Sequence, residues 1–427
     1  MRDVAVGILG VGTVGSGVLS VLHAKGDRIA GSLGARIVVK RALVRDLDKP
    51  RTVPLSSGLL TSDADAVLDD DAIQVVVELL GGEEPARAYI ERALRSGKHV
   101  VTGNKEVIAK HGRELLQVAA EQGVNLFYEA SVGGGIPIIR VLRRDLVANE
   151  ISQIQAIING TTNYILTDME QGRDYADALR QAQALGYAEA DPRNDVEGID
   201  AAYKLSILAT LAFRADVRPE DLYRRGIVEL DTKDFRYARE MGYVIKLIAS
   251  ARLVDGQIEA AVTPTLLPED HHLAAVKGVF NAVLIDGDEI DKLMLYGRGA
   301  GAKPTSSAVL ADLCAVVQDI VSGVAERIEF PRQRRALRPF AETEARYYVR
   351  MLVADQPGVL AQIAQILGDE RISIASCIQK ETDDEARVAE LVIMTHPAGH
   401  GRIDRALGRI GSLPITRKIN SVLRVGR

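Results

Sequence analysis

A short acidic stretch holds the densest group of chemically useful side chains in the chain. Between residues 185 and 204 it contains several carboxylates and one lysine: Glu189, Asp191, Asp195, Glu197, Asp200 and Lys204. Pro192 and Gly198 predict a loop, and a helix is expected to open near Ile199. On that helix Asp200 and Lys204 are separated by one turn and therefore share a face.

Two interpretations fit this pattern. Carboxylates with an ammonium group one turn away can hold the amino group of a zwitterionic amino acid and present a base to it. The alternative is a solvated acidic loop before an ordinary helix with one surface ion pair, which is what most charge runs are. The stretch alone leaves both open, so the elements that position it matter.

A glycine-rich turn near residue 10 has the spacing of a dinucleotide-binding motif. Residues 3–9 are an apolar run typical of a buried parallel strand, and a helix is expected to follow through about residue 24. The G-x-G-x-x-G turn between them allows a tight bend, approach of a pyrophosphate and close packing of the helix, whose N-terminus stabilises phosphate charge. We therefore expect contacts to a nucleotide from Gly10, Gly12, Thr13, Val14 and Gly15.

The end of the second strand bears on which nucleotide binds. Residues 36–44 are predicted to form that strand, and in NAD-binding domains an acid near its end often takes the ribose hydroxyls. Here Arg45 precedes Asp46, and Arg45, with Lys49 or Arg51, has the charge to pair with a 2′-phosphate. The residues favour NADP over NAD. Use of both stays open because Asp46 is adjacent, and Arg45 can equally be an ordinary surface residue.

Alternating strands and helices continue this first region. The strands are expected over 73–80, 99–102 and 125–128, and the helices over 84–96 and 111–122. This alternation predicts a doubly wound parallel sheet, and ligands bind beyond the carboxyl ends of such strands. Lys105 follows the strand 99–102 at that edge and is therefore a candidate for the site.

From residue 151 the pattern changes to that of an α+β domain with an antiparallel sheet. A strand over 151–158 leads into NGTTNY at residues 159–164, and hairpins are expected to turn at 254–257 and 286–288. The glycine-rich loop 297–304 lacks the ending of a P-loop. A helix over 306–321 follows it and is expected to return to the nucleotide-binding sheet and cover it. Three successive glycines at 133–135 indicate either close approach to a ligand or a hinge.

The last part of the chain has the order βαββαβ of a small ferredoxin-like module. The strands are expected over 347–353, 372–379, 387–395 and 415–425, and the helices over 356–367 and 402–410. Pro357 would lie in the first turn of the earlier helix, where proline is tolerated. A charged stretch with two prolines precedes the module and is predicted to be a linker.

Composition limits the class of protein. At 427 residues the chain is expected to hold two or three domains. Hydrophobic and charged contents of 47% and 26% are those of a soluble globular protein, and a net charge of -5 without a basic block argues against nucleic-acid binding. Glycines interrupt the uncharged run 4–22, so we interpret it as strand, turn and helix rather than a signal peptide or membrane span. Cys314 and Cys377 form no CxxC pair, which excludes a disulfide framework and suits a reducing cytoplasm.

Several motifs spread in order over residues 1–330 together resemble homoserine dehydrogenase. They are GVGTVG, VTGNKE, YEASVGGGIP, NGTTNY, GYAEADPRNDVEGIDAAYK and GRGAGAKPTSSAV. The long acidic motif is highly specific. The sequence contains no aspartate kinase portion, so it resembles the monofunctional form. The resemblance implies a reversible, NAD(P)-dependent interconversion of L-homoserine and L-aspartate 4-semialdehyde in threonine, methionine and isoleucine biosynthesis.

The same resemblance implies roles for individual residues. Lys204 and Lys105 would be the catalytic lysines, and Lys105 would also contact the cofactor, as would Gly301 of the second glycine-rich loop. The homoserine site would be shaped by Glu189, Asp195, Asp200, Tyr187, Gly160 and Thr161. A monovalent cation, Na⁺ or K⁺, would be held mainly by backbone oxygens of Glu129, Val132, Gly134 and Ile136.

The C-terminal module resembles an ACT regulatory domain. The matching segments are DQPGVLAQIAQIL at residues 355–367 and ISIASCIQ shortly after it. This resemblance implies feedback inhibition by an end-product amino acid, most simply threonine, bound near Asp355 and Gly358. The alternative is an oligomerisation module that binds no effector. The resemblance also implies a homodimer or homotetramer.

Two other functions compete with this interpretation. Aspartate-semialdehyde dehydrogenase shares the substrate pool, but it needs a catalytic cysteine, and neither Cys314 in a predicted helix nor Cys377 in the tail suits that role. The other is a non-enzymatic, amino-acid-sensing protein with a relict nucleotide domain. The pair Lys105 and Lys204 argues against it.

The expected architecture is an α/β chain of three domains. They are a Rossmann-like dinucleotide-binding domain over 1–136 and 304–330, an α+β substrate and dimerisation domain over 137–303, and a ferredoxin-like (ACT) domain over 347–427, reached through a linker over 331–346. We expect a cytoplasmic protein that binds neither nucleic acid nor membrane.

Overall fold

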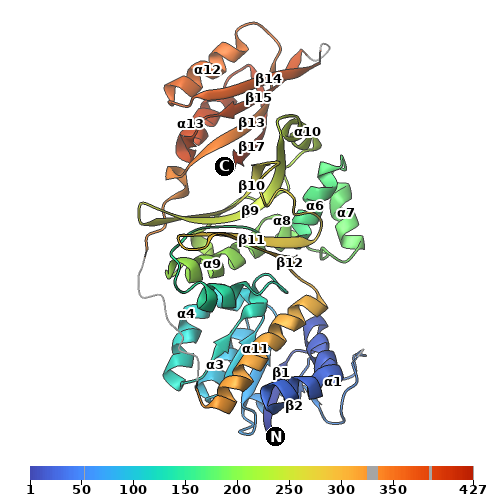
Figure 1. Cartoon of the computed structure of the whole chain (residues 1–427). Helices are drawn as coiled ribbons and strands as arrows, with labels where there is room; N and C mark the ends of the chain where they lie inside the picture. The colour runs from blue at the N-terminus through green and yellow to red at the C-terminus, as the bar shows by residue number, and fades with distance from the viewer. Residues whose placement is uncertain (52, 325–334, 384–386, 427) are drawn as a thin grey trace. The chain divides into compact units, whose positions relative to one another are not determined.

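The chain forms two compact units, each assembled from segments that are far apart in the sequence (Figure 1). The structure is a computed structural model that describes residues 1–51, 53–324, 335–383 and 387–426. Unit 1 is Met1–Ile151, Tyr203–Glu220 and Asn281–Arg334, and unit 2 is Ser152–Ala202, Asp221–Phe280 and Arg335–Arg427. The two units do not follow the domain boundaries expected from the sequence, which remain predictions.

Unit 1 contains a six-stranded parallel sheet in the order β3-β2-β1-β4-β5-β6. The strands are β1 Arg2–Leu9, β2 Ala35–Leu43, β3 Leu60–Thr61, β4 Val75–Glu78, β5 His99–Thr102 and β6 Leu126–Phe127. Every paired neighbour runs parallel, so the predicted doubly wound sheet is confirmed. The central strand β4 is buried at each position, as expected where helices cover both faces of a parallel sheet.

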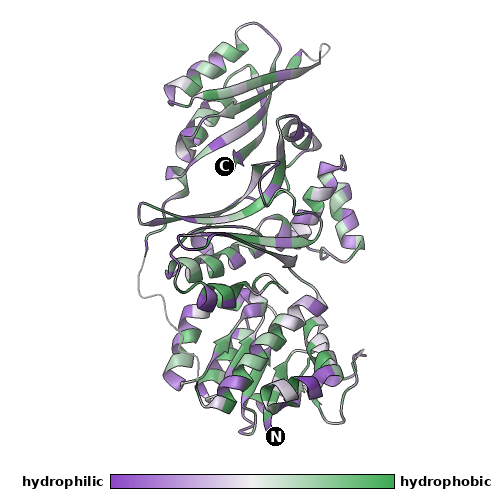
Figure 2. Ribbon diagram, viewed as in Figure 1, coloured by the Kyte–Doolittle hydropathy of each residue, from purple (hydrophilic) through white to green (hydrophobic). Residues whose placement is uncertain are grey.

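The other elements of unit 1 are helices, short helical turns and two further strands. They are α1 Thr13–Leu33, α2 Asp65–Leu68, α3 Ala86–Arg95, α4 Lys105–Gln122, η1 Glu129–Ser131, α5 Ile138–Arg140, the π-turn η2 Val141–Asp145, β11 Phe280–Gly287, β12 Asp291–Arg298 and α11 Ala302–Ser322. Helix α11 packs on α1 and β5, so the predicted return of this segment to the nucleotide-binding sheet is confirmed. Figure 2 shows hydrophilic and hydrophobic positions alternating along these helices, which bury one face in the core.

Three helices of unit 1 differ from the predicted ranges. Helix α1 runs well past residue 24 and ends only where Gly34 takes the left-handed conformation, at φ 71. Helix α4 begins at Lys105 rather than at residue 111, because the Asn104 side chain caps it. Helix α11 begins at Ala302, before the predicted residue 306, and Pro304 is tolerated in its first turn because those N–H groups have no intrahelical partner.

Helix α11 is the one helix among the described residues that is long and apolar enough to cross a membrane. Its apolar face lies in the core of unit 1, through Val309, Leu313, Val316 and Val317, all fully buried. Buried core helices of this length satisfy the same criterion, and the packing of α11 identifies it as one of them.

Unit 2 is built on one mixed sheet with the strand order β7-β9-β10-β17-β13-β15-β14. The strands are β7 Ile151–Ile157, β8 Tyr223–Arg224, β9 Tyr243–Val254, β10 Gln257–Pro268, β13 Glu344–Ala354, β14 Ile374–Asp383, β15 Val388–Thr395, β16 Ala398–Gly399 and β17 Thr416–Val425. The short β8 and β16 pair with β10 and β13. Strands β9 and β10 form the hairpin predicted around 254–257.

The helices of unit 2 are α6 Gly160–Glu170, α7 Tyr175–Ala184, α8 Arg193–Val196, α10 Thr232–Glu240, α12 Val359–Asp369 and α13 His400–Gly411, with the 3-10 turn η4 Phe340–Glu342. The 3-10 turn η3, Pro219–Asp221, begins in a segment of unit 1 and ends at the first residue of a segment of unit 2. Helix α9, Ile199–Phe213, begins in unit 2 and continues in unit 1, and its predicted start is confirmed. The segment before it is not all loop, because the backbone oxygen of Pro192 accepts from Asp195 and Val196 and closes the one-turn helix α8.

The C-terminal module has the predicted order βαββαβ, with its own apolar core between the sheet and the helices α12 and α13. Helix α12 starts at Val359 rather than at residue 356, because Gly358 adopts φ 89 and ends the preceding turn. Pro357 therefore lies outside the helix. Strand β13 starts at Glu344, before the predicted residue 347.

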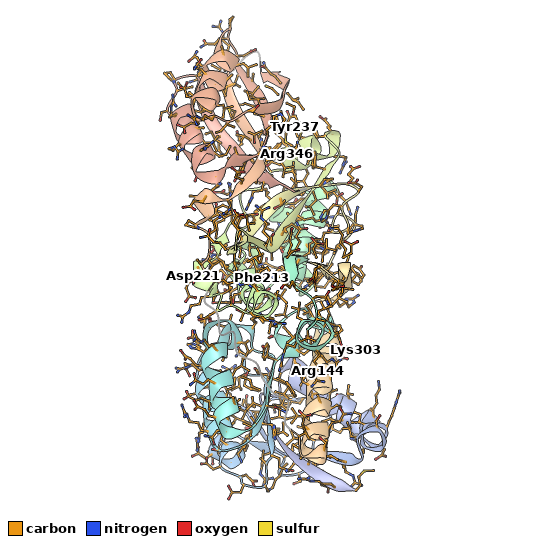
Figure 3. The ribbon with its side chains drawn as sticks, turned by 60° about the vertical axis from the view of Figure 1, so that its left-hand side comes forward. Arg144, Phe213, Asp221, Tyr237, Lys303 and Arg346 are labelled. Carbon is orange, nitrogen blue, oxygen red and sulfur yellow. The ribbon has the colours of Figure 1, made fainter. Side chains whose placement is uncertain are left out.

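The module is continuous with the rest of unit 2, which was not predicted. Strand β17 runs parallel to β10, with Thr265 opposite Arg424 and Leu266 opposite Val425. Arg346 of β13, labelled in Figure 3, donates to the hydroxyl of Tyr243 on β9 at 3.4 Å. The strands of the C-terminal module and the β9–β10 hairpin therefore belong to one continuous sheet.

The linker predicted over 331–346 is only partly described, since residues 331–334 lie outside the described residues, as do 325–330 of the predicted dinucleotide-binding segment. Leu337 forms a bridge with Ile258, and the Arg338 N–H donates to the Ile258 oxygen at 2.8 Å. The described part of this stretch therefore runs along β10 at Ile258, and the linker remains a prediction.

Candidate active site

The glycine-rich turn between β1 and α1 has the shape that a pyrophosphate requires. Gly10 has φ 103, and a Cβ there would lie 2.7 Å from the Leu79 oxygen. A Cβ on Gly15 would lie 2.2 Å from the Gly10 oxygen, whereas one on Gly12 would meet nothing within 4 Å. Gly10 and Gly15 are therefore demanded by the turn itself, and Gly12 faces open space that a phosphate can enter.

The start of α1 is left open to an anion. Its first turn holds Thr13, Val14 and Gly15, carries no acidic residue, and is not capped by a side chain. The backbone N–H groups of such a turn attract negative charge. Ser306 of α11 donates to the Val14 oxygen at 3.0 Å, which fixes this turn against the return helix.

The residues expected to choose the nucleotide follow β2 and are exposed. The Asp46 carboxylate accepts from the N–H groups of Asp48 and Lys49, so it folds its own turn. Arg51 donates to the Asp46 backbone oxygen at 2.7 Å. Arg45 is exposed beside this turn and is accessible to a ligand.

A series of hydrogen-bonded polar groups at the carboxyl ends of β4 and β5 supports the helix turn that carries Lys105. Glu78 accepts from the Thr102 hydroxyl at 2.5 Å, and that hydroxyl accepts from the Asn104 N–H at 2.9 Å. The Asn104 side chain donates to the Gly82 oxygen at 2.7 Å and caps α4 at Val107. These bonds fix the first turn of α4, where Lys105 lies.

Burial raises the pKa of the Glu78 carboxyl above its ordinary value, while the hydrogen bond from Thr102 and the N–H of Leu80 oppose that shift. Neither Glu78 nor Thr102 was expected to matter. A glutamate at the end of an otherwise apolar strand, VVVE, is the signal that could have identified them.

Lys204 lies on α9 with only 8% of its surface exposed. The residue before it, Tyr203, has its hydroxyl 3.4 Å from a carboxylate oxygen of Glu106, the residue after Lys105. Lys110 is placed over the Tyr203 ring and pairs with Glu106 at 2.7 Å. The structure therefore brings together the two helix segments that carry Lys105 and Lys204.

In unit 2, two predicted site carboxylates share one amide. Asn159 Nδ2 donates to Asp195 at 2.7 Å and to Asp200 at 2.9 Å, and the Asn159 carbonyl caps α6 by accepting from the Thr162 N–H. Asp200 is 4% exposed and Asn159 is also buried. Asn159 was not among the expected site residues, although an asparagine between a strand and a glycine is a typical helix cap.

The other expected substrate residues divide into those near this cluster and those in solvent. Thr161, beside Gly160 in the first turn of α6, donates to the Tyr187 backbone oxygen at 2.7 Å. The Tyr187 ring is half-exposed and packs on Tyr164 with centroids 5.1 Å apart. Glu189 is exposed, and its backbone oxygen accepts from Gln183.

Part of the acidic stretch is a solvated face. Asp191 pairs with Arg193 on the surface, and this arginine lowers the pKa of the Asp191 carboxyl to about 2. Glu197 is exposed as well. The pair of the half-buried Asp195 and the buried Asp200 is thus distinct from its neighbours in the sequence.

Glu129, which precedes the glycine loop 133–135, is held by backbone N–H groups and by helix α11. Both carboxylate oxygens of Glu129 accept backbone N–H groups, from Ile139 and Arg140, each at 2.8 Å. The Glu129 N–H donates to Asp312 of α11 at 2.7 Å. Burial raises the pKa of Glu129, and burial likewise raises the pKa of Asp312, to about 7.

This loop touches the second glycine-rich loop. A Cβ on Gly134, which has φ 53, would lie 2.4 Å from the Gly299 oxygen, and the Gly135 N–H donates to the Arg298 oxygen at 3.1 Å. Gly301 has φ 117 and caps the start of α11. The expected cation residues Glu129, Val132, Gly134 and Ile136 therefore belong to one compact turn that contacts the return loop. Within the described part of the chain no three His, Cys, Asp or Glu side chains form a metal cluster.

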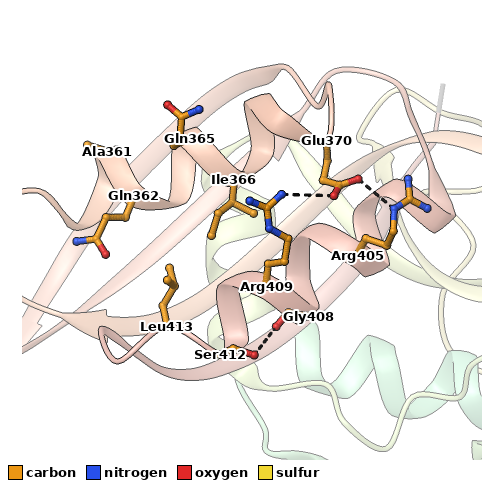
Figure 4. A pocket seen from close by; sticks show the side chains of 10 residues that line it. All are labelled: Ala361, Gln362, Gln365, Ile366, Glu370, Arg405, Gly408, Arg409, Ser412 and Leu413. Atoms are coloured by element: carbon orange, nitrogen blue, oxygen red, sulfur yellow. Dashed lines mark hydrogen bonds and ion pairs between the residues drawn. The ribbon is translucent and has the colours of Figure 1, made fainter.

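The expected effector residues lie at the turn between β13 and α12. Asp355 and Gly358 are exposed, and the Asp355 N–H donates to the Arg387 oxygen at 2.9 Å. A shallow groove lies elsewhere on the module, between α12 and α13 (Figure 4). It carries the ion pairs of Glu370 with Arg405 and Arg409, and neither expected effector residue lines it.

Neither cysteine has the surroundings of a nucleophile. Burial raises the pKa of the Cys314 thiol on α11 and of the Cys377 thiol on β14. A catalytic cysteine needs the opposite shift, toward the thiolate. The function that depends on a catalytic thiol is therefore disfavoured.

Three family models match successive parts of the chain. Residues 10–129 match "Homoserine dehydrogenase, NAD binding domain", residues 137–314 match "Homoserine dehydrogenase", and residues 347–414 match "ACT domain". These matches cover the dinucleotide turn, the acidic stretch and the C-terminal module in the order in which the motifs occur.

Full-length relatives agree with the models. A homoserine dehydrogenase of Bacillus subtilis is 39% identical over 427 residues, covering 100% of this chain and 99% of the relative. One of Synechocystis is 43% identical, covering 99% of both chains.

Solved structures agree as well. A homoserine dehydrogenase from Thiobacillus denitrificans superposes with a TM-score of 0.94 at 43% identity, over 100% of this chain and 99% of that one. A hyperthermophilic archaeal homoserine dehydrogenase in complex with NADPH superposes with a TM-score of 0.62 at 30% identity, over 74% of this chain and 98% of that one. The chain therefore belongs to the homoserine dehydrogenase family, the NAD(P)-dependent oxidoreductases that act on the CH–OH group of homoserine, and it carries a C-terminal ACT domain.

Proposed function

We propose that Lys204 and Lys105 are the catalytic lysines with which the chain interconverts L-homoserine and L-aspartate 4-semialdehyde. The observation that carries this assignment is the contact of Tyr203 with Glu106, because each of these residues adjoins one of the two lysines. Their helices, α9 and α4, are thereby held together in unit 1 at the carboxyl edge of the parallel sheet, where such folds bind ligands.

The nicotinamide supplies the hydride acceptor or donor when the cofactor is bound. The chain fits the cofactor through the Gly10 turn, the open space at Gly12 and the uncapped start of α1, at Thr13 and Val14. We assign Gly301 to the same cofactor. The exposed Arg45 favours NADP, since a guanidinium pairs well with a 2′-phosphate.

Lys204 exchanges the proton with the substrate oxygen, directly or through a water. Lys105 orients the substrate and stabilises alkoxide charge. The buried chain from Glu78 to Asn104 serves this role by fixing the turn that carries Lys105, and a fixed donor stabilises developing charge better than a mobile one.

The substrate ammonium is assigned to the carboxylates of unit 2. Asp195 of α8 and Asp200 of α9, which Asn159 holds together, supply two carboxylates beside the start of α6. Glu189, Tyr187, Gly160 and Thr161 complete the homoserine site in this proposal. Glu189 is exposed, so it would meet the substrate from the solvent side.

A monovalent cation, Na⁺ or K⁺, fits the turn 129–136. Backbone oxygens are the ligands that such ions take in place of water, and glycines at positive φ let successive carbonyls turn to one side. Gly133 and Gly134 have φ 74 and 53. The carboxylates of Glu129 and Asp312 lie against the same turn. Glu129, Val132, Gly134 and Ile136 would hold the ion.

The ACT domain supports regulation by an amino acid, and we propose threonine, bound near Asp355 and Gly358. The exposed turn that carries both residues is accessible to a ligand. We further propose a homodimer or homotetramer in the cytoplasm, with no nucleic acid or membrane partner.

Replacing Lys204 with methionine tests the central assignment. Loss of the proton-exchanging group should lower kcat by about 100-fold or more while the affinity for NADPH stays nearly unchanged. NADPH consumption with L-aspartate 4-semialdehyde measures the turnover, and it separates an enzyme from an amino-acid-sensing protein.

Lys98 provides a matched control, because it is a lysine equally buried in unit 1 at the opposite, amino end of β5. Its amine donates to the backbone oxygens of Asp70 and Ile73. Lys98→Met should lower thermal stability and leave kcat close to that of the wild type. Near-normal turnover in Lys204→Met would remove Lys204 from the mechanism.

A further inference from the structure

The sheet of the C-terminal module has two buried faces. On β13 the side chains of Tyr347, Val349 and Met351 point into the core with α12 and α13. Strand residues alternate between faces, so Tyr348 and Arg350 point the other way. That second face is covered by α10, which belongs to the catalytic part of the chain.

The contact between this face and α10 is ionic. Arg350 donates to Asp234 of α10 at 2.7 Å and to Glu390 of β15 at 2.8 Å. The hydroxyls of Ser421 and Tyr348 donate to Asp234 at 2.6 and 3.0 Å. Two strands of the module, β13 and β17, thus converge on one aspartate of α10, and β15 joins the group through the pair of Glu390 with Arg350.

The group is buried and its hydrogen bonding is extensive. Asp234, Arg350 and Glu390 are 0%, 1% and 3% exposed. The second oxygen of Glu390 accepts from the hydroxyl of Tyr237 on α10 at 3.0 Å, and Lys233 lies 3.5 Å from it. Buried charges that are paired in this way hold one geometry, because any shift leaves a charge without its partner.

Helix α10 leads from this group to the homoserine segment. It packs on α6, where Arg239 donates to the Glu170 backbone oxygen, and it runs directly into β9. On β9, Lys246 donates to the Val276 oxygen at 2.7 Å and to Asn163 of α6 at 3.4 Å. Asn163 lies in the first turn of α6, just after Asn159.

We propose that Arg350, although it belongs to the ACT domain, is a positioning residue for the homoserine-binding segment, acting through Asp234 and α10 on the start of α6. The proposal rests on the proposed function, because it takes Gly160, Thr161 and the Asn159-bound carboxylates as the homoserine site. It names the route of regulation: β13 carries Arg350 and ends one residue before Asp355, at the expected effector turn. Contiguous packed and hydrogen-bonded groups can couple sites in this way, and variants along the route decide whether they do.

The test compares variants of the full chain. Arg350→Met removes the charge and both ion pairs, and Arg350→Lys keeps the charge but loses the forked geometry. Arg338→Met is the matched control, because Arg338 also binds two carboxylates in unit 2, Asp255 and Glu259, but on the β9–β10 hairpin instead of α10.

The measurements are the KM for homoserine, the KM for NADP, kcat, and the concentration of L-threonine that halves activity. Arg350→Met should raise the homoserine KM by about fivefold or more and weaken inhibition by threonine by a similar factor, as expected for a coupling between sites. The NADP KM should not change. Arg350→Lys should fall between the wild type and Arg350→Met, and Arg338→Met should match the wild type.

A folded Arg350→Met protein with unchanged homoserine KM overturns the proposal, whether or not threonine inhibits the wild type. If Arg350→Met does not fold, Tyr237→Phe decides, because it removes one hydrogen bond to Glu390 and should raise the homoserine KM with no effect on the NADP KM. Failure of the wild type to oxidise homoserine would instead contradict the proposed function.

Discussion

Residues that are neighbours in the acidic stretch lie in different environments, some exposed and some buried. Asp191 is exposed and neutralised by Arg193, whereas Asp200 is buried and held with Asp195 by one amide of Asn159. Burying a carboxylate costs free energy even when it is hydrogen-bonded, so the burial of Asp200 indicates a use for this group. The solvated-face interpretation therefore holds for Glu189, Asp191 and Glu197 and not for Asp200.

The buried Lys246 leads to a prediction about how the stability of the protein depends on pH. Burial lowers the pKa of this lysine from 10.5 to about 8. Above pH 8 the folded chain has released this proton while the unfolded chain retains it up to about 10.5. The contribution of Lys246 to stability therefore rises between these values, by roughly 1.4 kcal/mol per pH unit.

The comparison of wild type and Lys246→Met in urea unfolding between pH 7 and 10 measures this contribution. As the pH rises, the free energy of unfolding of the wild type should increase relative to that of the variant. Parallel curves for the two proteins would show that Lys246 keeps its ordinary pKa.

At the scale of elements, glycine is required in two loops where one backbone segment closely approaches another. The turn after β1 needs Gly10 and Gly15 for its own closure, and the loop 133–135 needs Gly134 because the Gly299 oxygen occupies the space of a side chain. Such positions serve the fold first. Gly12 differs because nothing in the chain lies close to it, which leaves that space for the cofactor.

Alanine at Gly12 and at Gly15 should therefore have different effects. Gly12→Ala should fold with the thermal stability of the wild type and bind NADPH weakly, because its methyl group enters the space of the pyrophosphate. Gly15→Ala should be destabilised by about 2 kcal/mol or more, because its Cβ would overlap the Gly10 oxygen. Thermal unfolding with and without NADPH distinguishes them, and equal stability of the two variants would contradict the assigned roles.

At the scale of the molecule, the C-terminal domain is built into unit 2. Its strand β17 pairs with β10, and its sheet covers α10 through the Asp234 group. The ACT domain therefore shares its sheet with the rest of unit 2. A displacement of the C-terminal module is therefore transmitted directly to β10 and α10, because no hinge separates them from it.

Ending the chain after residue 343 should consequently not yield a desensitised enzyme. The truncation would expose Asp234 without its arginine, at a cost on the order of 3–5 kcal/mol, and would leave the edge of β10 unpaired. We expect a lower thermal midpoint and self-association on gel filtration. Asp355→Ala, which keeps the sheet intact, should instead stay folded and lose inhibition by threonine. A stable, active truncated protein would contradict the view that the domain is structural.

Much of the fold could be predicted because its signals are local. The strand, glycine turn and helix at the N-terminus and the βαββαβ order each depend on periodicity and turn residues within a short window. The predicted limits of helices were less accurate where a single residue sets them. Asn104 starts α4 well before residue 111, and Gly358 delays α12 to residue 359.

The sequence by itself therefore determined the family, the parallel sheet and the residues worth testing, since motifs and apolar patterns are properties of neighbouring residues. Only the tertiary structure decided which groups meet. Asn159 finds its carboxylates 36 and 41 residues away, and Arg350 finds Asp234 at a separation of 116 residues. An arginine on a strand predicts a solvated face, and only folding reveals that another helix covers that face with an opposite charge.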